Sequence, residues 1–175
     1  TGAPVIESEG KKYQVDIIYG KASSPKDPIS DKTVAATLNA LTDNPNSSIL
    51  VFLPGQGEIR RVEDSLVLEL HSRKISDVQL RTLYGNLSLE AQQAAIAPVQ
   101  NAGERKIVLA TNIAETSLTI EGVDVVIDTG LAREPVFDPT SGMTRLHTRK
   151  ISQASSTQRM GRAGRLRPGK CYRLW

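Results

Sequence analysis

The chain alternates between short apolar segments of strand type and longer segments in which apolar residues recur at helical spacing. Residues 49–53, Ile-Leu-Val-Phe-Leu, are continuously apolar, which is typical of a strand that is buried on both faces. Strand-like patterns are also present at residues 13–18, 78–84, 106–110 and 123–128.

Helical spacing lies between these strand segments. Val34, Leu38 and Leu41 are spaced i, i+4 and i+7, with Ser30 or Asp31 as the expected N-cap. Two further helices are predicted, one with its apolar face at Ile59, Val62, Leu66 and Leu70, and one from Ser88 to about Ile96. Repeated strand-helix-strand units predict an α/β fold with a mostly parallel sheet and helices on both faces.

One segment interrupts this alternation. After residues 128–130, Asp-Thr-Gly, come two short alternating runs separated by the turn-rich residues 138–142. This pattern predicts a β-hairpin whose second strand carries Arg145, His147, Arg149 and Lys150. The hairpin is either a protruding functional element or a ribbon that covers the edge of the sheet.

Charge is distributed unevenly along the chain. The formal net charge is only +3, but residues 133–175 contain ten Lys or Arg and two acidic residues. Such asymmetry indicates a polyanionic partner for one part of the surface, with a solvated basic edge as the alternative.

Composition also limits the class of protein. The 175 residues suit a single domain, and the single cysteine, Cys171, excludes an internal disulfide and favours a reduced, buried thiol. Because no segment resembles a signal peptide or approaches the roughly 20 apolar residues of a membrane span, we expect a cytoplasmic chain without a membrane partner.

The segment from Gln158 to Arg165, Gln-Arg-Met-Gly-Arg-Ala-Gly-Arg, is the strongest indication of function. If it is helical, Gln158, Gly161, Arg162 and Arg165 share one narrow face, with Ala163 on the opposite side. Guanidinium groups hold phosphate oxygens in a fixed geometry, so this face suits a nucleoside triphosphate. The alternative is a solvated basic helix.

Two strand ends carry further candidate groups. Residues 54–58, Pro-Gly-Gln-Gly-Glu, form a glycine-rich turn before a helix, which is typical of an anion site. The turn is half of a G-x-G-x-x-G dinucleotide motif, but Arg60 replaces the third glycine, so a phosphate of a nucleic acid is favoured. Thr111 and Asn112, after the strand at 106–110, are suited to contact phosphate oxygens at the carboxyl edge of the sheet.

Several motifs are missing from the sequence. It contains no P-loop of the form G-x-x-x-x-G-K-[ST], no acidic Mg²⁺ motif and no clustered His or Cys for a metal. The chain therefore has an arginine surface for a triphosphate without a cradle that would hold one. This combination predicts half of an ATP site, with the other half on another domain.

These motifs resemble those of DEAH-box helicases. Residues 111–120, TNIAETSLTI, resemble motif V, and residues 158–165, QRMGRAGR, resemble motif VI. Residues 52–59 and 83–93 resemble motif IV and the segment after it, and residues 151–175 are most similar to the bacterial HrpB type. The resemblance covers essentially the whole chain and implies a single C-terminal RecA-like domain at 1–175, with 1–12 as lead-in from the interdomain linker and 133–150 as a hairpin insertion.

The resemblance also implies roles for individual residues. Arg162 and Arg165 would be arginine fingers for ATP and Mg²⁺ bound on an absent first RecA-like domain, and Gln158 would contact the γ-phosphate or the attacking water. The nucleotide would be approached by Ser117, Thr119, Glu121 and Gly161. The backbone of RNA, or of DNA, would be held by Gly55, Gln56, Thr111, Asn112, Arg145 and Arg149.

The family further implies an ATP-dependent RNA helicase that is inactive as this fragment and that includes a winged-helix region elsewhere in the same parent chain. One departure is visible: residues 96–98, Ile-Ala-Pro, lack the aromatic that many members stack on adenine. Two alternatives remain open, a nucleic-acid-binding module without a catalytic role and a dinucleotide-binding enzyme of Rossmann type.

Overall fold

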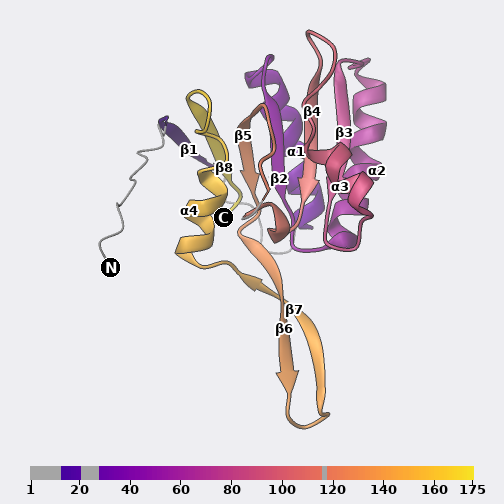
Figure 1. Ribbon diagram of the computed structural model, residues 1–175, viewed down its shortest axis with the longest axis vertical. Helices are drawn as coiled ribbons and strands as arrows, with labels where there is room; N and C mark the ends of the chain where they lie inside the picture. Colours follow the sequence, from indigo (N-terminus) through magenta and orange to yellow (C-terminus); the bar gives the residue numbers. More distant parts are fainter. Residues whose placement is uncertain (1–12, 21–27, 116–117) are drawn as a thin grey trace, which may run out of the picture.

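The computed structural model describes residues 13–20, 28–115 and 118–175. Its body is a six-stranded, fully parallel sheet with the strand order β1-β8-β5-β2-β4-β3 (Figure 1). The strands are β1 (Val15–Tyr19), β2 (Ser48–Phe52), β3 (Val78–Leu83), β4 (Arg105–Ala110), β5 (Val123–Asp128) and β8 (Gly169–Arg173). Every residue of the central strands β2 and β5 is buried, as the continuous apolar run at 49–53 predicts for β2.

Helices cover both faces of this sheet. On one face, α1 (Ile29–Asp43) and α2 (Gln56–Ser72) bury their apolar sides against alternate residues of β2, β4 and β5. On the other face, α3 (Leu89–Ile96), the 3₁₀ helix η1 (Asn112–Ala114) and the segment after α4 (Gln153–Met160) pack on the remaining residues. The predicted RecA-like α/β architecture is confirmed.

The predicted helix N-termini agree with the structure for α3 but not for α1. The side chain of Ser88 accepts a hydrogen bond from the Ala91 N–H, so the start of α3 is confirmed. The start of α1 was predicted wrongly: the N-cap is Pro28, and Ser30 and Asp31 lie within the first turn. Proline has its φ fixed and needs no N–H at this position, and Asp31 still favours the positive end of the helix dipole.

The hairpin consists of β6 (Leu131–Asp138) and β7 (Met143–Lys150), which form a separate antiparallel sheet. Figure 1 shows it projecting far beyond the body, and all eight residues of β7 are exposed. Asp138 stabilises the turn by accepting hydrogen bonds from the Thr140 N–H and the Ser141 hydroxyl, and Gly142 takes the positive φ of 64° that the turn requires. The alternative of a ribbon covering the sheet edge is therefore wrong.

Cys171 lies in β8 at the sheet interior. Its side chain is fully buried, and burial together with the nearby Asp128 carboxylate raises the thiol pKa to about 12. The thiol is therefore protonated and unreactive near neutral pH, which fits the structural role expected of it.

Candidate functional site

The segment predicted as one helical face is only partly helical. The helix α4 ends at Met160, with Gly161 as its C-cap, and residues 161–167 form turns. Hydrogen bonds from the Arg162 N–H to the Arg159 carbonyl and from the Ala163 N–H to the Met160 carbonyl replace the helical spacing. The predicted helix face from Gln158 to Arg165 is therefore wrong in geometry, although Ala163 is buried as expected.

The turns nevertheless keep the predicted side chains together. A groove of about 550 Å³ lies beside the end of α4. It is lined by Gln158, Gly161, Arg162 and Arg165, and also by Tyr13, Val15, Glu115, Thr157, Met160 and Gly164. The four positions selected from motif VI thus share one concave surface.

The two arginines of this groove differ in environment. Arg162 is buried, and its Nη atoms donate to the backbone carbonyls of Glu115 and Leu118. Burial, together with the neighbouring Arg165, lowers the pKa of Arg162, but a guanidinium remains charged. Arg165 is exposed, with a long contact of 3.4 Å from Nη1 to the Thr119 hydroxyl. One guanidinium is therefore fixed to the protein, and the other is available to a ligand.

The remaining nucleotide-side predictions are placed unequally. Thr119 is exposed and lies next to Arg165, and Gly161 is exposed at the groove. Glu121 is exposed in the turn before β5 and is outside the set of residues that line the groove in the described chain. Ser117 lies outside the described residues.

Arg159 links this groove to the rest of the sheet edge. Its side chain is 0% exposed, and Nε donates to Glu115 Oε1 at 2.7 Å. Nη1 donates to Asp128 Oδ1 at 2.9 Å and to the Leu131 carbonyl at 3.1 Å, and the guanidinium lies 4.8 Å from the ring centre of Phe52. Arg159 thereby connects α4, the loop after η1, the end of β5 and the start of the hairpin.

The predicted nucleic-acid contacts at the strand ends lie on neighbouring strands. Gly55 and Gln56 follow β2, and Thr111 and Asn112 follow β4, which pairs with β2. Asn112 is exposed, and the Thr111 side chain, although at an N-cap position, makes no capping hydrogen bond. The carboxyl edge of the sheet therefore presents both groups side by side, as a parallel arrangement requires.

Gly55 has a neighbour that the sequence did not indicate. A Cβ at Gly55 would lie 2.6 Å from Nη1 of Arg133, so the Arg133 side chain rests directly on this glycine. Nη2 of Arg133 also pairs with Glu58 Oε1 at 3.1 Å. These contacts attach the root of the hairpin to the start of α2 and place a cation beside the predicted anion site.

The hairpin carries the other predicted nucleic-acid contacts. Arg145 and Arg149 are exposed on β7 and are four residues apart, so they share one face of the ribbon with His147. Arg145 and Arg149 lie opposite Val136 and Ala132 of β6, and His147 between them lies opposite Glu134. This face is therefore mainly basic, with one carboxylate at its middle.

The groove offers guanidinium and amide donors. The described ranges contain no group of three or more His, Cys, Asp or Glu side chains that could hold a metal ion. Within residues 13–20, 28–115 and 118–175, no helix has the length and hydropathy needed to cross a membrane.

Sequence reasoning missed the ion cluster around Arg159. In the sequence, Arg159 is one of three arginines in the segment 158–165, and its burial has no periodic signal. Asp128 offered an indication, because a carboxylate at the end of a buried strand needs a cationic partner.

Comparison with known proteins identifies the family of the chain. Residues 32–167 match the helicase conserved C-terminal domain. The ATP-dependent RNA helicase HrpB of Escherichia coli K12 is 50% identical over 167 residues, which is 95% of this chain and 20% of HrpB.

Solved structures lead to the same relative. Two crystal structures of E. coli HrpB, described as a DExH-box NTPase and as a DEAH/RHA helicase, are each 49% identical and cover 98% of this chain. Their TM-scores are 0.85 and 0.86, and this chain covers 20% and 21% of them. The chain thus spans about a fifth of the length of the relatives that it matches. It belongs to the family of helicase conserved C-terminal domains, in the DEAH-box group that includes HrpB.

Proposed function

We propose that this chain is the second motor domain of an ATP-dependent RNA helicase, acting on ATP that is held by a first RecA-like domain elsewhere in the parent chain. The observation that carries the proposal is the groove after α4, where exposed Arg165 lies beside anchored Arg162. A single domain at 1–175, with 1–12 as linker and 133–150 as the hairpin insertion, belongs to the same proposal.

In this proposal Arg165 and Arg162 stabilise negative charge on the transferred phosphoryl group. ATP with Mg²⁺ supplies that group and its leaving group when bound between the two domains. Arg165 is free to reach across, which is the geometry of an arginine finger. Arg162 contributes charge from the groove wall, Gln158 positions the attacking water, and Gly161 permits close approach. The nucleotide-side positions are Ser117, Thr119 and Glu121.

The nucleic acid is held through its backbone in this proposal. Thr111 and Asn112 contact phosphates at the end of β4, and Gly55 and Gln56 do so at the start of α2. Arg145 and Arg149 extend the contacts along the hairpin. Such contacts carry no sequence information, so binding of RNA, or of DNA, is sequence-tolerant and weakens as salt is raised.

Coupling between the two sites follows from their shared supports. Closure onto ATP acts on the segment after α4, and Arg159 near the end of α4 pairs with Glu115, which follows η1 with Asn112, and with the Leu131 carbonyl at the hairpin root. Alternating closure and opening against the first RecA-like domain, with the winged-helix region of the same chain attached, then moves the strand past the hairpin.

The test uses the complete parent helicase and the substitution Arg165→Ala. Because Arg165 is exposed, its loss leaves folding intact and removes charge stabilisation in the transition state. RNA-stimulated ATP hydrolysis is expected to fall by at least about a hundredfold while ATP binding is retained. The matched control is Arg73→Ala, which removes an exposed guanidinium at the far end of α2 and leaves turnover unchanged.

A different outcome favours the second candidate function. If Arg165→Ala leaves ATP turnover unchanged and weakens RNA binding, the domain is a nucleic-acid-binding module without a catalytic role. The observation behind this candidate is the exposed, mainly basic face of the hairpin, which requires no nucleotide.

A further inference from the structure

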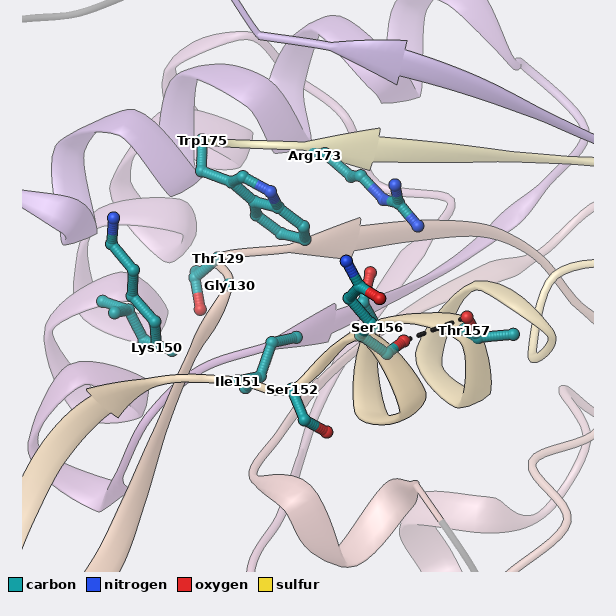
Figure 2. Close-up of a pocket in the computed structure, with 11 residues that line it drawn as sticks. Thr129, Gly130, Lys150, Ile151, Ser152, Ser156, Thr157, Arg173 and Trp175 are labelled. Carbon is teal, nitrogen blue, oxygen red and sulfur yellow. Dashed lines mark hydrogen bonds between the residues drawn. The ribbon is translucent and has the colours of Figure 1, made fainter.

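A second concave surface lies at the opposite end of α4 from the arginine groove. This pocket has a volume of about 480 Å³ and is formed where β5, β8, the hairpin root and the start of α4 meet (Figure 2). Its eleven lining residues are Thr129, Gly130, Leu131, Lys150, Ile151, Ser152, Gln153, Ser156, Thr157, Arg173 and Trp175. We call it the Trp175 pocket.

The polar lining of the Trp175 pocket suits an anion. Lys150 and Arg173 supply two positive charges, and the lining set of the described chain contains no Asp or Glu. The N-terminus of α4 also lies at this pocket. The Ser152 hydroxyl accepts a hydrogen bond from the Ser155 N–H, and the other N–H groups of the first turn have no intrahelical acceptor.

Two buried polar atoms at this pocket lack partners within the described residues. Ser156 is 7% exposed and lines the pocket, but its Oγ makes no hydrogen bond. Nε of Arg173 is likewise buried and unpaired, although Nη1 donates to the Tyr19 hydroxyl at 3.1 Å. Buried polar atoms without partners are costly, so we expect the Ser156 hydroxyl in the pocket wall to pair with a bound polar group.

An aromatic ring forms the remaining wall. The Trp175 ring lies against the backbone of Gly130, where an added Cβ would come within 2.5 Å of Cε3, and the Arg173 guanidinium is 5.4 Å from the ring centre. Within this chain, whose last residue is Trp175, that side chain is 49% exposed. A ring held on one side and open on another is a stacking platform for a planar base.

We propose that the Trp175 pocket binds one nucleotide of a single-stranded nucleic acid, with its base on Trp175 and its phosphate near Lys150, Ser156 and the α4 N-terminus. This inference rests on the proposed nucleic-acid function. The pocket lies at the carboxyl ends of β5 and β8, and β5 pairs with β2, which Gly55 follows. It therefore continues the edge that carries Gly55 and Asn112.

The pocket adjoins the proposed ATP groove at Thr157, which lines both. Lys150, Ser152 and Trp175 line only the Trp175 pocket, and Arg162 and Arg165 line only the groove. The two sites therefore use different charged and aromatic groups, and we expect a strand in the pocket and a nucleotide in the groove to bind together.

The test measures binding of a short oligouridine RNA, and of an abasic oligonucleotide of equal length, to the complete parent helicase by fluorescence anisotropy. Trp175→Ala is expected to weaken oligouridine binding about tenfold and to leave abasic binding unchanged, because only the base stacks. Trp175→Phe keeps a ring and restores most of the affinity.

A charge variant tests the phosphate side. Lys150→Gln is expected to weaken the binding of both oligonucleotides about threefold. It should also lower the slope of log Kd against log salt concentration by about 0.7. Lys74→Gln is the matched control, since Lys74 is exposed after the last turn of α2, at the opposite edge of the sheet, and its loss leaves both affinities unchanged.

Each outcome decides the inference. Equal binding of oligouridine by Trp175→Ala and wild type overturns it, and that is also the result expected if another region of the parent chain covers the pocket. If Trp175→Ala loses equal affinity for oligouridine and for the abasic strand, the variant has a structural defect and the stacking role is overturned. Wild type that binds neither strand overturns the proposed function as well, whereas unchanged ATP turnover in Arg165→Ala affects the proposed function alone.

Discussion

At the scale of single residues, the buried guanidinium of Arg159 has the most demanding environment. It pairs with Asp128 and Glu115, and both Arg159 and Asp128 have side chains that are 0% exposed. Burial raises the pKa of Asp128, and the Arg159 charge opposes that rise. The Arg159 charge therefore favours the ionised form of the Asp128 carboxyl group, whose side chain has no solvent exposure.

Removing one partner of this pair is expected to be costly. Arg159→Met leaves Asp128 buried without its cation, so the free energy of unfolding should fall by about 3–5 kcal/mol in urea denaturation. Arg73→Met, which breaks the exposed pair with Glu69, should cost about 1 kcal/mol or less.

A double variant separates the ion pair from simple loss of packing. Asp128→Asn needs no counter-charge, so combining it with Arg159→Met should cost clearly less than the sum of the two single changes. Strictly additive losses would contradict the pairing and point to packing alone.

The sequence indicated the residues that line the arginine groove better than the residues that support them. Arg162, Arg165 and Gln158 were found because the motif is local, and the fold brings them to one groove. Arg159, Glu115 and Asp128 are 13 to 44 positions apart in the chain and meet only through the topology of the sheet. Local periodicity contains no information about such contacts.

At the scale of elements, α3 is fixed to the sheet by cations at its C-terminus. Lys106 of β4 donates from Nζ to the carbonyls of Ile96 at 3.1 Å and Ala97 at 2.5 Å. Arg81 of β3 donates to the carbonyls of Ala94 and Ala97. These contacts satisfy the free carbonyls of the helix end and match its negative dipole.

The charge on Lys106 gives this element a pH dependence. Burial, aided by the nearby Arg81, lowers the pKa of Lys106 from 10.5 to about 8. Between pH 8 and pH 10.5 the unfolded chain therefore binds a proton at Lys106 that the folded chain has released. Stability from this group rises with pH through that window, by about 3 kcal/mol when complete.

The comparison of wild type with Lys106→Met isolates this effect. The difference in unfolding free energy should shift in favour of wild type as pH rises from 8 to 10.5, because methionine does not titrate. Cys171 acts in the opposite direction, since its raised pKa loses stability as pH rises, but it does so in both proteins and cancels. A constant difference over this window would show that Lys106 titrates normally.

The apolar spacing in the sequence failed to predict where α4 ends. Apolar spacing predicted the strands and helices of the body, but the end of α4 depends on glycines. A Cβ at Gly164 would lie 2.6 Å from the Tyr13 carbonyl, and the Tyr13 N–H donates to the Gly164 carbonyl at 3.0 Å. This close approach to the chain before β1 needs turns after Met160, and no helical periodicity indicates it.

At the scale of the whole molecule, the proposed division of the ATP site between two domains makes a prediction for this chain alone. Both faces of the sheet have their own buried clusters, whereas the sequence has no P-loop and the described chain has no metal-ligand cluster. The 175-residue chain alone is expected to show no ATP hydrolysis with Mg²⁺ and RNA, measured as phosphate release beside the parent helicase. Turnover by the pure chain would refute the half-site proposal.

The hairpin root has a mechanical consequence. Arg133 pairs with Glu58, the Leu131 carbonyl accepts from Arg159, and the Ile151 N–H donates to the Gly130 carbonyl at 2.9 Å. A ribbon clamped at three points behaves as a lever arm, and eight residues per strand give it a length of about 27 Å. A turn of the body by about 10° then sweeps the tip through about 5 Å, more than the roughly 3.4 Å between successive base pairs along a duplex.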